Sequence, residues 1–549
     1  MHTKTYVIST VIIYLLAVGT SSATNYYVHP DLGNDQNPGT SLIKPLQSLE
    51  KASTLELKPG DVILLAAGHT FYGSLELRDV AGTDEAPIVI ASYSLSSALK
   101  DKRAVIDAKG YLNGISLTDC SHIIVENLIV SANGGGLKKD KRTKKSMRCG
   151  ILVTTSKAGE YTNINLQNLL IRDIFFEEKG HVRGKDEVRT ANGTQNYGWG
   201  IRFINSISEA RLKNLTVSNC VVQNVAHTGI KFTGRNQSIH HIKVHNNRVL
   251  KTGGPGIQMS GVLVGHVKGN YVNQSGSNDD TRKWGRGSGL WTWSTSDVVI
   301  ENNHFMNANG PADSAGCHID FNCTNVVVQY NFSANNAGGF CEILGNNYNC
   351  AYRYNISVND GHRVKGKNGA FQEGKVFWLS GYQGRDNPRK GPFNSYFYNN
   401  TIYVSKNLVA KMAIPKTASG VLVVNNIFCI EGDSKAVLGD QYKPEKPGGG
   451  DVKNVVFDNN LYLKATNWPK EVLIQDKGRT IGDPQFFRKG GLDIMDYIPK
   501  NTQLIKNKGM EIPIIPQDKI GLTIGVKAEY DILGNKITGK PDMGAIELE

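Results

Sequence analysis

The sequence predicts an all-β fold, a solenoid of short parallel strands stacked into a coil, from three observations. An asparagine-centred phrase recurs along the chain; it stands at Asn246-Asn247, Asn270, Asn302-Asn303, Asn331, Asn355, Asn399-Asn400, Asn425-Asn426 and Asn459-Asn460. Its tightest spacings are 23 residues, from Asn247 to Asn270, and 24, from Asn331 to Asn355, a period typical of solenoids. The segments between phrases are short β-branched runs without helical periodicity.

Asparagine suits the bends of such a coil because it tolerates left-handed backbone angles and bonds neighbouring main chain. Stacked asparagines can also share amide hydrogen bonds from one turn to the next. We therefore expect the phrases to mark equivalent corners of successive turns.

The first 23 residues have the pattern of a secretory signal. Lys4 supplies the positive start, an apolar run extends from Tyr6 to Gly19, and Ser21-Ser22-Ala23 is a small-residue cleavage site. The apolar run is short for a membrane span, and no later segment qualifies. We expect a secreted or periplasmic protein whose residues 24–549 form a single domain.

Both ends of the repeat region have features that suit a coil's ends. A short helical stretch is expected up to Leu57 within an N-terminal cap of residues 24–70, and residues 440–549 are expected to close the other end. The entry around Pro59-Gly60-Asp61 and the ending Gly539-Lys540-Pro541-Asp542 resemble right-handed parallel β-helix proteins of the pectate-lyase-like superfamily. The resemblance implies a right-handed coil and a carbohydrate-active protein, either a lyase, a dehydratase or a glycoside hydrolase.

Several polar, glycine-rich segments interrupt the period and are expected to leave the coil as loops. They are residues 136–148, 177–196, 274–288, 361–375, 381–392 and 440–450. Insertions in a solenoid usually collect on one face, often the binding face. Such loops could close one end of a groove, which favours an enzyme acting at chain ends.

Glycine-led strands between the phrases predict one column of outward side chains. Side chains alternate across a strand, so the core should hold Ile201, Phe203, Ile230, Phe232, Cys317, Ile319, Cys341 and Ile343. The opposite face should present Arg202, Lys231, Gln258, Trp291, His318, Asp320 and Glu342. A column of cations, an amide, an indole, an imidazole and carboxylates suits a groove that binds saccharides.

Neighbouring residues could extend this groove. Trp293 shares a face with Trp291, and His227 precedes the Lys231 strand. Basic residues of nearby loops could grip carboxylates or sulfates; they are Lys283, Arg286, His362 and Arg363. For each of these residues a solvated or buried structural role is the alternative.

The net charge and the cysteines limit which partners and metal ions the chain is expected to bind. The net charge is +13, and removing residues 1–23 removes Lys4 and no acid, so an acidic or sulfated polysaccharide is a more suitable partner than nucleic acid for an exported chain. Cys317 and Cys341 should stack inside the coil, whereas Cys323 and Cys350 could pair. No zinc-type spacing occurs; no cofactor is expected to be required, calcium at Asp320 and Glu342 is conceivable, and a monomer is expected.

The preferred chemistry is β-elimination on a uronic acid of an anionic, ulvan-like glycan, by a polysaccharide lyase or a chain-end oligosaccharide dehydratase that forms a 4,5-unsaturated uronate. Lys231 or His227 would be the base and His318 the proton donor. Arg202 would neutralise the carboxylate, and Asp320 and Glu342 would orient it. Trp291 would support the sugar face.

Two alternatives remain open from the sequence. Asp320 and Glu342 on adjacent turns could be the carboxylate pair of a glycoside hydrolase. The tryptophans and basic loops would also suffice for a polysaccharide-binding coil without catalytic activity.

Overall fold

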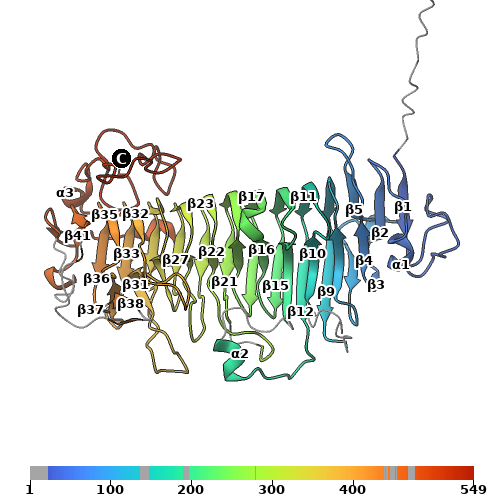
Figure 1. Cartoon of the computed structure of the whole chain (residues 1–549), viewed down its shortest axis with the longest axis horizontal. Coiled ribbons are helices and arrows are strands. Elements are labelled where there is room, and N and C mark those ends of the chain that lie inside the picture. Colours follow the sequence, from blue (N-terminus) through green and yellow to red (C-terminus); the bar gives the residue numbers. More distant parts are fainter. Residues whose placement is uncertain are drawn as a thin grey trace, which may run out of the picture.

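The computed structural model describes residues 23–135, 147–189, 197–277, 280–437 and 476–548, with 439–440, 443–444, 452 and 454–467 between the last two ranges. Three long parallel sheets run side by side along the molecule (Figure 1). The fold is thus a right-handed parallel β-helix, as predicted. The predicted secretory signal, residues 1–23, lies outside the described residues except for its last position, as does most of the loop 136–148.

The β1 sheet has 14 strands in the described chain. They are β1 (Asn25–Val28), β2 (Val62–Ala66), β5 (Ile88–Tyr93), β8 (Ile123–Glu126), β11 (Gly159–Gln167), β14 (Ala210–Ser218), β17 (Ile239–His245), β20 (Val262–Lys268), β23 (Ser296–Glu301), β26 (Thr324–Gln329), β29 (Ala351–Arg353), β32 (Phe393–Tyr398), β35 (Ser419–Val424) and β40 (Val455–Asp458).

The β3 sheet also has 14 strands there. They are β3 (Thr70–Tyr72), β6 (Ala104–Asp107), β9 (Leu128–Asn133), β12 (Leu170–Phe175), β15 (Val221–Val225), β18 (Arg248–Thr252), β21 (Tyr271–Asn273), β24 (His304–Met306), β27 (Phe332–Ala334), β30 (Ile356–Val358), β33 (Thr401–Val404), β36 (Ile427–Ile430), β41 (Leu461–Tyr462) and β42 (Thr480–Ile481).

The β4 sheet, which carries the candidate site, has 12 strands in the described ranges. They are β4 (Leu75–Arg78), β7 (Asn113–Thr118), β10 (Arg148–Thr154), β13 (Gly198–Asn205), β16 (Ile230–Gly234), β19 (Ile257–Ser260), β22 (Leu290–Trp293), β25 (Cys317–Ile319), β28 (Gly339–Ile343), β31 (Lys375–Leu379), β34 (Ala410–Ala413) and β37 (Ser434–Ala436). A small antiparallel pair, β38 (Gly439–Asp440) and β39 (Lys443–Pro444), follows.

The two positions of the recurring asparagine phrase have different structural roles. The first position takes the left-handed conformation at the bend, as in Asn302 (φ 53°) and Asn425 (φ 58°), and Tyr330 and Tyr354 do the same. The second position forms a buried ladder in which each amide bonds the next; its members are Asn247, Asn270, Asn303, Asn331, Asn355, Asn400, Asn426, Asn460 and finally Asp476. The predicted ladder is confirmed.

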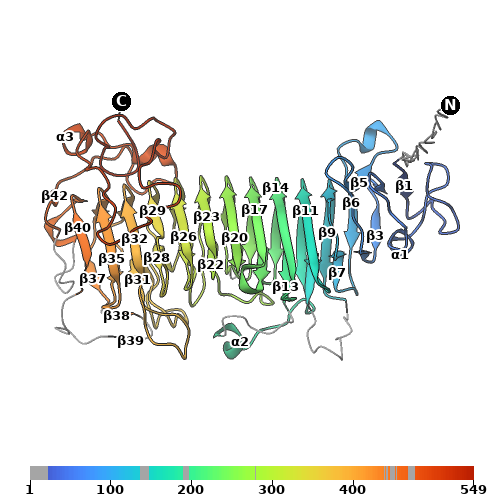
Figure 2. The same cartoon turned by 45° about the horizontal axis from the view of Figure 1, so that its top comes forward.

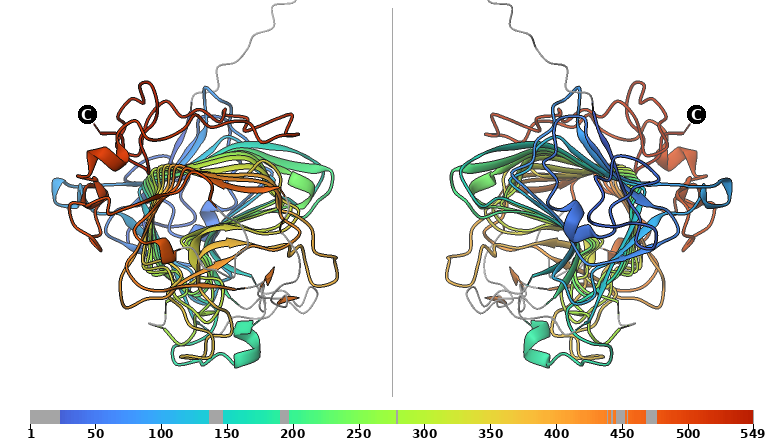
Figure 3. Two further views of the ribbon diagram at one scale, coloured as in Figure 1. Left: turned by 90° about the vertical axis from the view of Figure 1, so that its left-hand side faces the viewer. Right: turned by 90° about the vertical axis from the view of Figure 1, so that its right-hand side faces the viewer.

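The core lies between the three sheets, which Figure 3 shows end-on. All eight side chains predicted to point inward, Cys317 and Cys341 among them, belong to the main buried cluster. Cys323 and Cys350 are buried free thiols, so the conceivable disulfide between them is not formed.

The helices of the described residues are short and lie in the segments between strands or after the last strand. They are α1 (Leu49–Ala52), shorter than the expected stretch to Leu57, α2 (Lys185–Arg189), α3 (Thr502–Ile505) and 3-10 turns at Ser97–Leu99, Arg235–Gln237, Ala465–Asn467 and Ile494–Tyr497. Leu49 and Ala52 of α1 join the core. Within the described residues, no helix has the length and apolarity needed to cross a membrane.

The C-terminal segment packs on the outside of the coil near its end (Figure 2). Ile505, Ile532 and Met543 lie in one buried cluster with Tyr403 and Ile427 of the β3 sheet. A second cluster joins Ile515, Leu522 and Ala528 to side chains of the β1 sheet. This segment therefore covers two faces of the coil and leaves the β4 sheet to the loops.

Candidate functional site

The predicted column exists on the outer face of the β4 sheet. Arg202 of β13 is in register with Lys231 of β16, then come Gln258 of β19, Trp291 of β22 and His318 of β25. Ile319 of β25 pairs with Ile343 of β28, which places His318 beside Glu342. Consecutive turns thus carry the predicted side chains in the predicted order.

The column faces outward from the sheet, but most of its side chains are nearly inaccessible to solvent. Gln258, His318 and Glu342 are 3–4% exposed, and Arg202 and Lys231 are 5% and 8% exposed. They line a pocket of about 390 Å³ whose walls include Arg286, Asp313 and Tyr382. These wall residues come from the loops 274–289, 307–316 and 380–392, which connect strands of the β4 sheet to its neighbours.

Asp320 lines the acidic half of this pocket. Its Oδ2 accepts a hydrogen bond of 2.7 Å from Trp291 Nε1, and its Oδ1 accepts one of 2.9 Å from the Phe321 amide. Burial nevertheless dominates and raises the pKa of Asp320 to about 7. This carboxyl can therefore hold a proton near neutral pH.

Asp313 faces the same pocket and was not predicted. Arg286 Nε donates to its Oδ2 at 2.7 Å and Arg286 Nη2 to its Oδ1 at 3.2 Å. Although burial alone would raise it, the pKa of Asp313 is lowered, because the attraction and hydrogen bond of Arg286 outweigh desolvation. Asp313 is therefore an ionised carboxylate at neutral pH.

The backbone at Asp313 is strained. Asp313 (φ 47°) and Ser314 (φ 63°) are consecutive non-glycine residues in the left-handed region, a conformation that persists only when surrounding contacts enforce it. Gln372 Oε1 accepts from the Asp313 amide at 2.7 Å, and Arg363 Nη1 donates to the Asp313 carbonyl at 2.8 Å. The loop is thus held in place from both sides.

The pKa values of Glu342 and His318 do not suit the roles predicted for these residues. Burial raises the pKa of Glu342 well above its usual range, even though Lys375 nearby opposes the shift. Burial lowers the pKa of His318 to about 4, and its Nδ1 is hydrogen-bonded to Ser288 Oγ at 2.9 Å. His318 is therefore uncharged at neutral pH, which argues against its predicted role as the proton donor.

The opposite half of the pocket is basic. Burial is the main cause that lowers the pKa of Arg202 and moves the pKa of Lys231 well below its usual range. The Arg202 guanidinium carbon lies 4.4 Å from the ring centre of Trp199. Among the residues that the structure describes, Arg202 Nε and Nη1 and Gln258 Oε1 have no hydrogen-bond partner.

Aromatic rings border both halves. Trp291 tilts against His318, with ring centres 5.7 Å apart, and Trp293 contacts Phe321 edge-on. Trp293 is 37% exposed, and Trp199, Trp378 and Tyr382 also line the pocket. As predicted, the two tryptophans of β22 share one face, where they could support sugar rings.

Four predicted residues lie outside this pocket. His227 is buried and stacks on Trp284, with ring centres 4.7 Å apart, so it lies among aromatic side chains and does not line the pocket. Lys283, His362 and Arg363 line a separate depression of about 920 Å³ on the outer side of the loops. Arg363 instead braces the Asp313 loop.

One feature of the sequence indicates that Asp313 could belong to the site. The stretch Gly310-Pro311-Ala312-Asp313-Ser314 directly precedes the Cys317 strand, and a loop leading into a site-bearing strand can aim a carboxylate at that site. The prediction of long insertions did not include this segment, because it is short.

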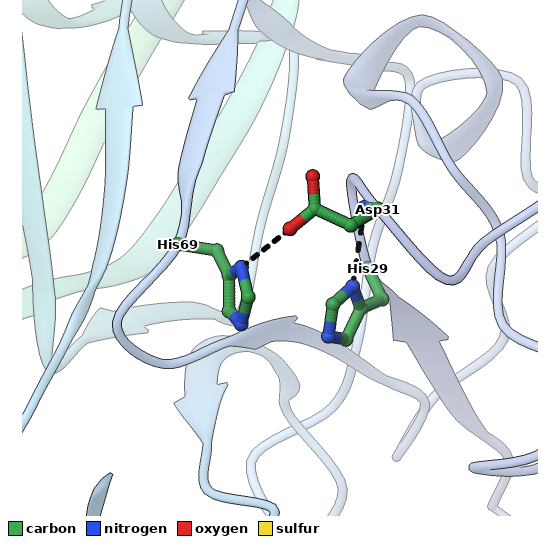
Figure 4. A group of neighbouring side chains, drawn as sticks. All are labelled: His29, Asp31 and His69. Carbon is green, nitrogen blue, oxygen red and sulfur yellow. Dashed lines mark hydrogen bonds and ion pairs between the residues drawn. The ribbon is translucent and has the colours of Figure 1, made fainter.

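A separate group of side chains could hold a metal ion. Within the described chain, His29, Asp31 and His69 offer ligand atoms that all lie within 4.8 Å of one another (Figure 4). His29 Nδ1 accepts from the Asp31 amide at 3.2 Å, and His69 Nδ1 lies 2.8 Å from Asp31 Oδ2. These bonds join the segment that follows β1 to the loop before β3, far along the chain from the pocket.

Comparisons with known proteins agree with the fold. A family model described as the right handed beta helix region matches residues 199–402. A lacto-N-biosidase from Bifidobacterium longum subsp. longum is 25% identical over 642 aligned positions. The alignment covers 97% of this chain, which spans only 37% of that relative's length.

Comparison with solved structures also agrees with the fold. A GH136 lacto-N-biosidase from Eubacterium ramulus superposes with a TM-score of 0.52 and 21% identity, covering 75% of this chain and 67% of that one. A PL6 family alginate lyase is similar at a TM-score of 0.46 and 14% identity over 92% of this chain and 60% of that one, too low to bear on the reaction. The chain is a right-handed parallel β-helix protein, and it shares that fold with carbohydrate-active enzymes.

Proposed function

We propose that this protein is a glycoside hydrolase that binds a glycan in the β4-sheet pocket and cleaves it with Asp320 and Asp313. The observation that carries the proposal is the opposite shift of two carboxyl pKa values in one pocket. Burial raises the pKa of Asp320 to about 7, whereas Arg286 holds Asp313 ionised. Glycoside hydrolysis requires one protonated and one ionised carboxyl group.

In this mechanism Asp320 protonates the glycosidic oxygen as the bond to the anomeric carbon breaks. Asp313 supplies negative charge on the other side of the reacting sugar, either by attacking the anomeric carbon or by activating a water molecule. Trp291 Nε1 fixes the orientation of Asp320, and the Arg286 fork fixes that of Asp313.

The pair predicted from the sequence, Asp320 and Glu342, is less suitable. Burial raises the pKa of both groups, so neither is the ionised partner that the reaction needs at neutral pH. Glu342, beside Lys375, has a place in the pocket wall that suits contact with substrate hydroxyls.

The comparisons support a hydrolase. Two relatives, at 25% and 21% identity, are named lacto-N-biosidases, and such a name describes a glycosidase. Together with the fold and the two tryptophans of β22, this favours a saccharide ligand for the pocket.

β-Elimination on a uronic acid, by a lyase or a chain-end dehydratase, is the second candidate, and the basic half of the pocket favours it. The lowered pKa of Lys231 increases the fraction of neutral amine that could remove a proton beside a carboxylate. Arg202 would neutralise that carboxylate. We rank this reaction second because it gives no role to the oppositely shifted aspartates.

The setting we propose is outside the cytoplasm, because residues 1–23 have the pattern of an export signal. The reaction as written needs no metal ion, since the two carboxyl groups supply the proton and the negative charge.

The test is a product assay on a panel of neutral, uronate-containing and sulfated oligosaccharides. We expect new reducing ends without the ultraviolet absorbance of a C4–C5 double bond. D320N and D313N should each lose this activity by at least about 100-fold, whereas E342Q should retain more. Ultraviolet absorbance that survives D320N and disappears in K231M would favour elimination; binding without any product would favour the non-catalytic alternative.

A further inference from the structure

The basic half of the pocket contains two buried basic side chains, Arg202 and Lys231, that have no counter-charge among the described residues. Arg202 and Lys231 are register partners on adjacent strands. In the part of the chain that the structure describes, Cys149 is the one charged partner that shifts the pKa of Arg202, Arg202 and Cys149 shift that of Lys231, and no carboxylate contributes to either. The Cys149 thiol does not compensate them, because burial raises its own pKa to about 12.

The other cations around the pocket are compensated. Arg286 forms a two-bond fork with Asp313. Lys375 lies close enough to Glu342 for each to shift the other's pKa, and the carboxylates of Asp313, Glu342 and Glu373 act on Arg363 to raise its pKa against the effect of burial. The absence of compensation is thus specific to the Arg202 end.

Burying an uncompensated guanidinium costs stability, because it loses hydration without gaining a partner. Arginine does not escape this cost by deprotonation. Its planar face rests on Trp199, which leaves the N–H groups at the edge of the guanidinium available for an acceptor. Such an arrangement is what a preorganised anion site requires.

This end of the pocket is closed. The next position in register beyond Arg202 is Leu152 of β10, which belongs to a buried cluster with Cys149, Tyr197, Trp199 and Trp284. A ligand that reaches the cations therefore ends there, and the acid group must be carried by its terminal unit.

We propose that Arg202, Lys231 and Gln258 form a subsite for an anionic substituent, a carboxylate or a sulfate, on the terminal sugar of the glycan. Arg202 and Lys231 bind the anion, and the free Gln258 Oε1 accepts a hydrogen bond from a neighbouring hydroxyl. The proposal rests on the proposed function only in taking the pocket as a saccharide site.

The subsite and the aspartates act on different parts of one ligand. Strands β16 and β25 are three steps apart in the β4 sheet, about 14 Å at the usual strand spacing. The cations thus select the terminal sugar, while Asp313 and Asp320 act on a bond deeper in the chain of sugars. The enzyme would release acidic units or short acidic fragments from chain ends.

The test measures binding without turnover. The full-length D320N protein is titrated with D-glucuronate, D-glucose 6-sulfate and D-glucose, with ligand-observed NMR as the readout. The same titrations are run with R202M and K231M added singly to D320N. The control is R172M, which removes a half-exposed arginine on β12 of the β3 sheet.

We expect at least one acidic sugar to bind at least about ten-fold more tightly than D-glucose. R202M and K231M should each abolish that preference, and R172M should preserve it. The preferred acid identifies the substituent as carboxylate or sulfate. R202M should also melt at an equal or higher temperature, because it removes an uncompensated buried charge; a structural role for Arg202 predicts the opposite.

Equal binding of all three sugars, no binding of either acid, or an acid preference that R202M and K231M leave intact would overturn the subsite. Failure of the proposed hydrolase is a separate result: D320N would retain full activity in the product assay whatever the binding data show. K231M provides the same test if R202M does not fold.

Discussion

Asp313 and Asp320 show how two identical side chains acquire different chemistry from their surroundings. Asp320 is almost fully enclosed and, among the described residues, accepts hydrogen bonds only from an indole and one backbone amide, so its charged form is disfavoured. Asp313 has a guanidinium across both oxygens, so its charged form is favoured. The split of the two pKa values is the basis of the acid and base roles that we propose for them.

The first prediction is the pH dependence of kcat/KM. Activity requires protonated Asp320 and ionised Asp313, so the profile should be a bell. The alkaline side should fall as pH rises through about 7, the pKa of Asp320. The acid side should fall only at low pH, because the pKa of Asp313 is lowered.

Substrates with a good leaving group, such as a dinitrophenyl glycoside, provide the control for this profile. They need little protonation, so their alkaline side should be flattened and D320N should cleave them far better than it cleaves natural linkages. An alkaline side that is unchanged with such a substrate would show that Asp320 is not the acid.

A second prediction concerns stability. The pKa of Asp320 is about 7 in the folded protein, against an ordinary value of 3.8, so the folded state binds this proton more tightly than the unfolded state does. Ionisation therefore costs stability as pH rises from about 4 to above 7. D320N should raise the melting temperature relative to wild type at pH 8 more than at pH 4.

Asp518 is the matched control for that measurement. Hydrogen bonds from Tyr396 and the backbone amides of Ile520 and Gly521 overcome burial and lower the pKa of Asp518, so its ionised form stabilises the fold. D518N should lower the melting temperature at pH 8 and have a smaller effect at acid pH. If D320N and D518N behaved alike, the raised pKa of Asp320 would be wrong.

At the scale of elements, the asparagine ladder fixes the register of the coil. Asn331 is fully buried and donates to the Ile300 and Gln329 carbonyls and to Asn355 Oδ1. Its own Oδ1 accepts from the amide and side chain of Asn303. Each turn is thereby bonded to the next on the inside of the same corner.

We therefore predict that N331A lowers the free energy of unfolding by about 2–4 kcal/mol, because several buried polar groups lose their partner at once. Chemical denaturation followed by circular dichroism provides the measurement. N168G is the control, since Asn168 (φ 53°) serves a bend outside the ladder and glycine adopts that conformation without cost. A loss no larger than that of N168G would contradict the ladder's role.

The loop that carries Asp313 depends on a neighbouring loop. Arg363 donates to the Gly310 and Asp313 carbonyls, and to the Gln372 carbonyl of its own loop. Removing this brace should let the left-handed Asp313–Ser314 pair relax toward an ordinary conformation. The carboxylate would then leave its position in the pocket.

We predict that R363M lowers kcat by about 10–100-fold with a smaller change in KM, because a small displacement of a reacting group is costly. Steady-state kinetics and the melting temperature together separate this effect from unfolding. K365M, which removes an exposed lysine side chain of the same loop, should behave as wild type. A rise in KM at unchanged kcat would instead make Arg363 a substrate contact.

At the scale of the whole molecule, the regular parts could be predicted and the irregular parts could not. Period, strand alternation and left-handed bends are local properties, so the coil, its core face and the order of the column follow from the sequence. The enclosure of Lys231 and Glu342 arises from loops contributed by distant turns. The role of Asp313 depends on Arg286 from another loop, and the burial of His227 depends on Trp284, so neither could be seen in any local pattern.

The chemistry predicted from the sequence also depended on which polar groups lie together in space. The column of outward residues contained cations and carboxylates, and the basic net charge favoured elimination on an acidic sugar. The three-dimensional arrangement separates these groups into a basic end and an acidic end. The acidic end holds the two aspartates of the proposed hydrolysis, and the basic end holds the residues of the proposed anion subsite.

The most direct test of hydrolysis is mass spectrometry of the products formed in heavy-oxygen water. We predict that each cleavage places one solvent oxygen on the new reducing end, and that D320N and D313N abolish this labelled product. Elimination would instead give products without solvent oxygen, and one of them, the unsaturated sugar, would be lighter by one water. That result would contradict the account.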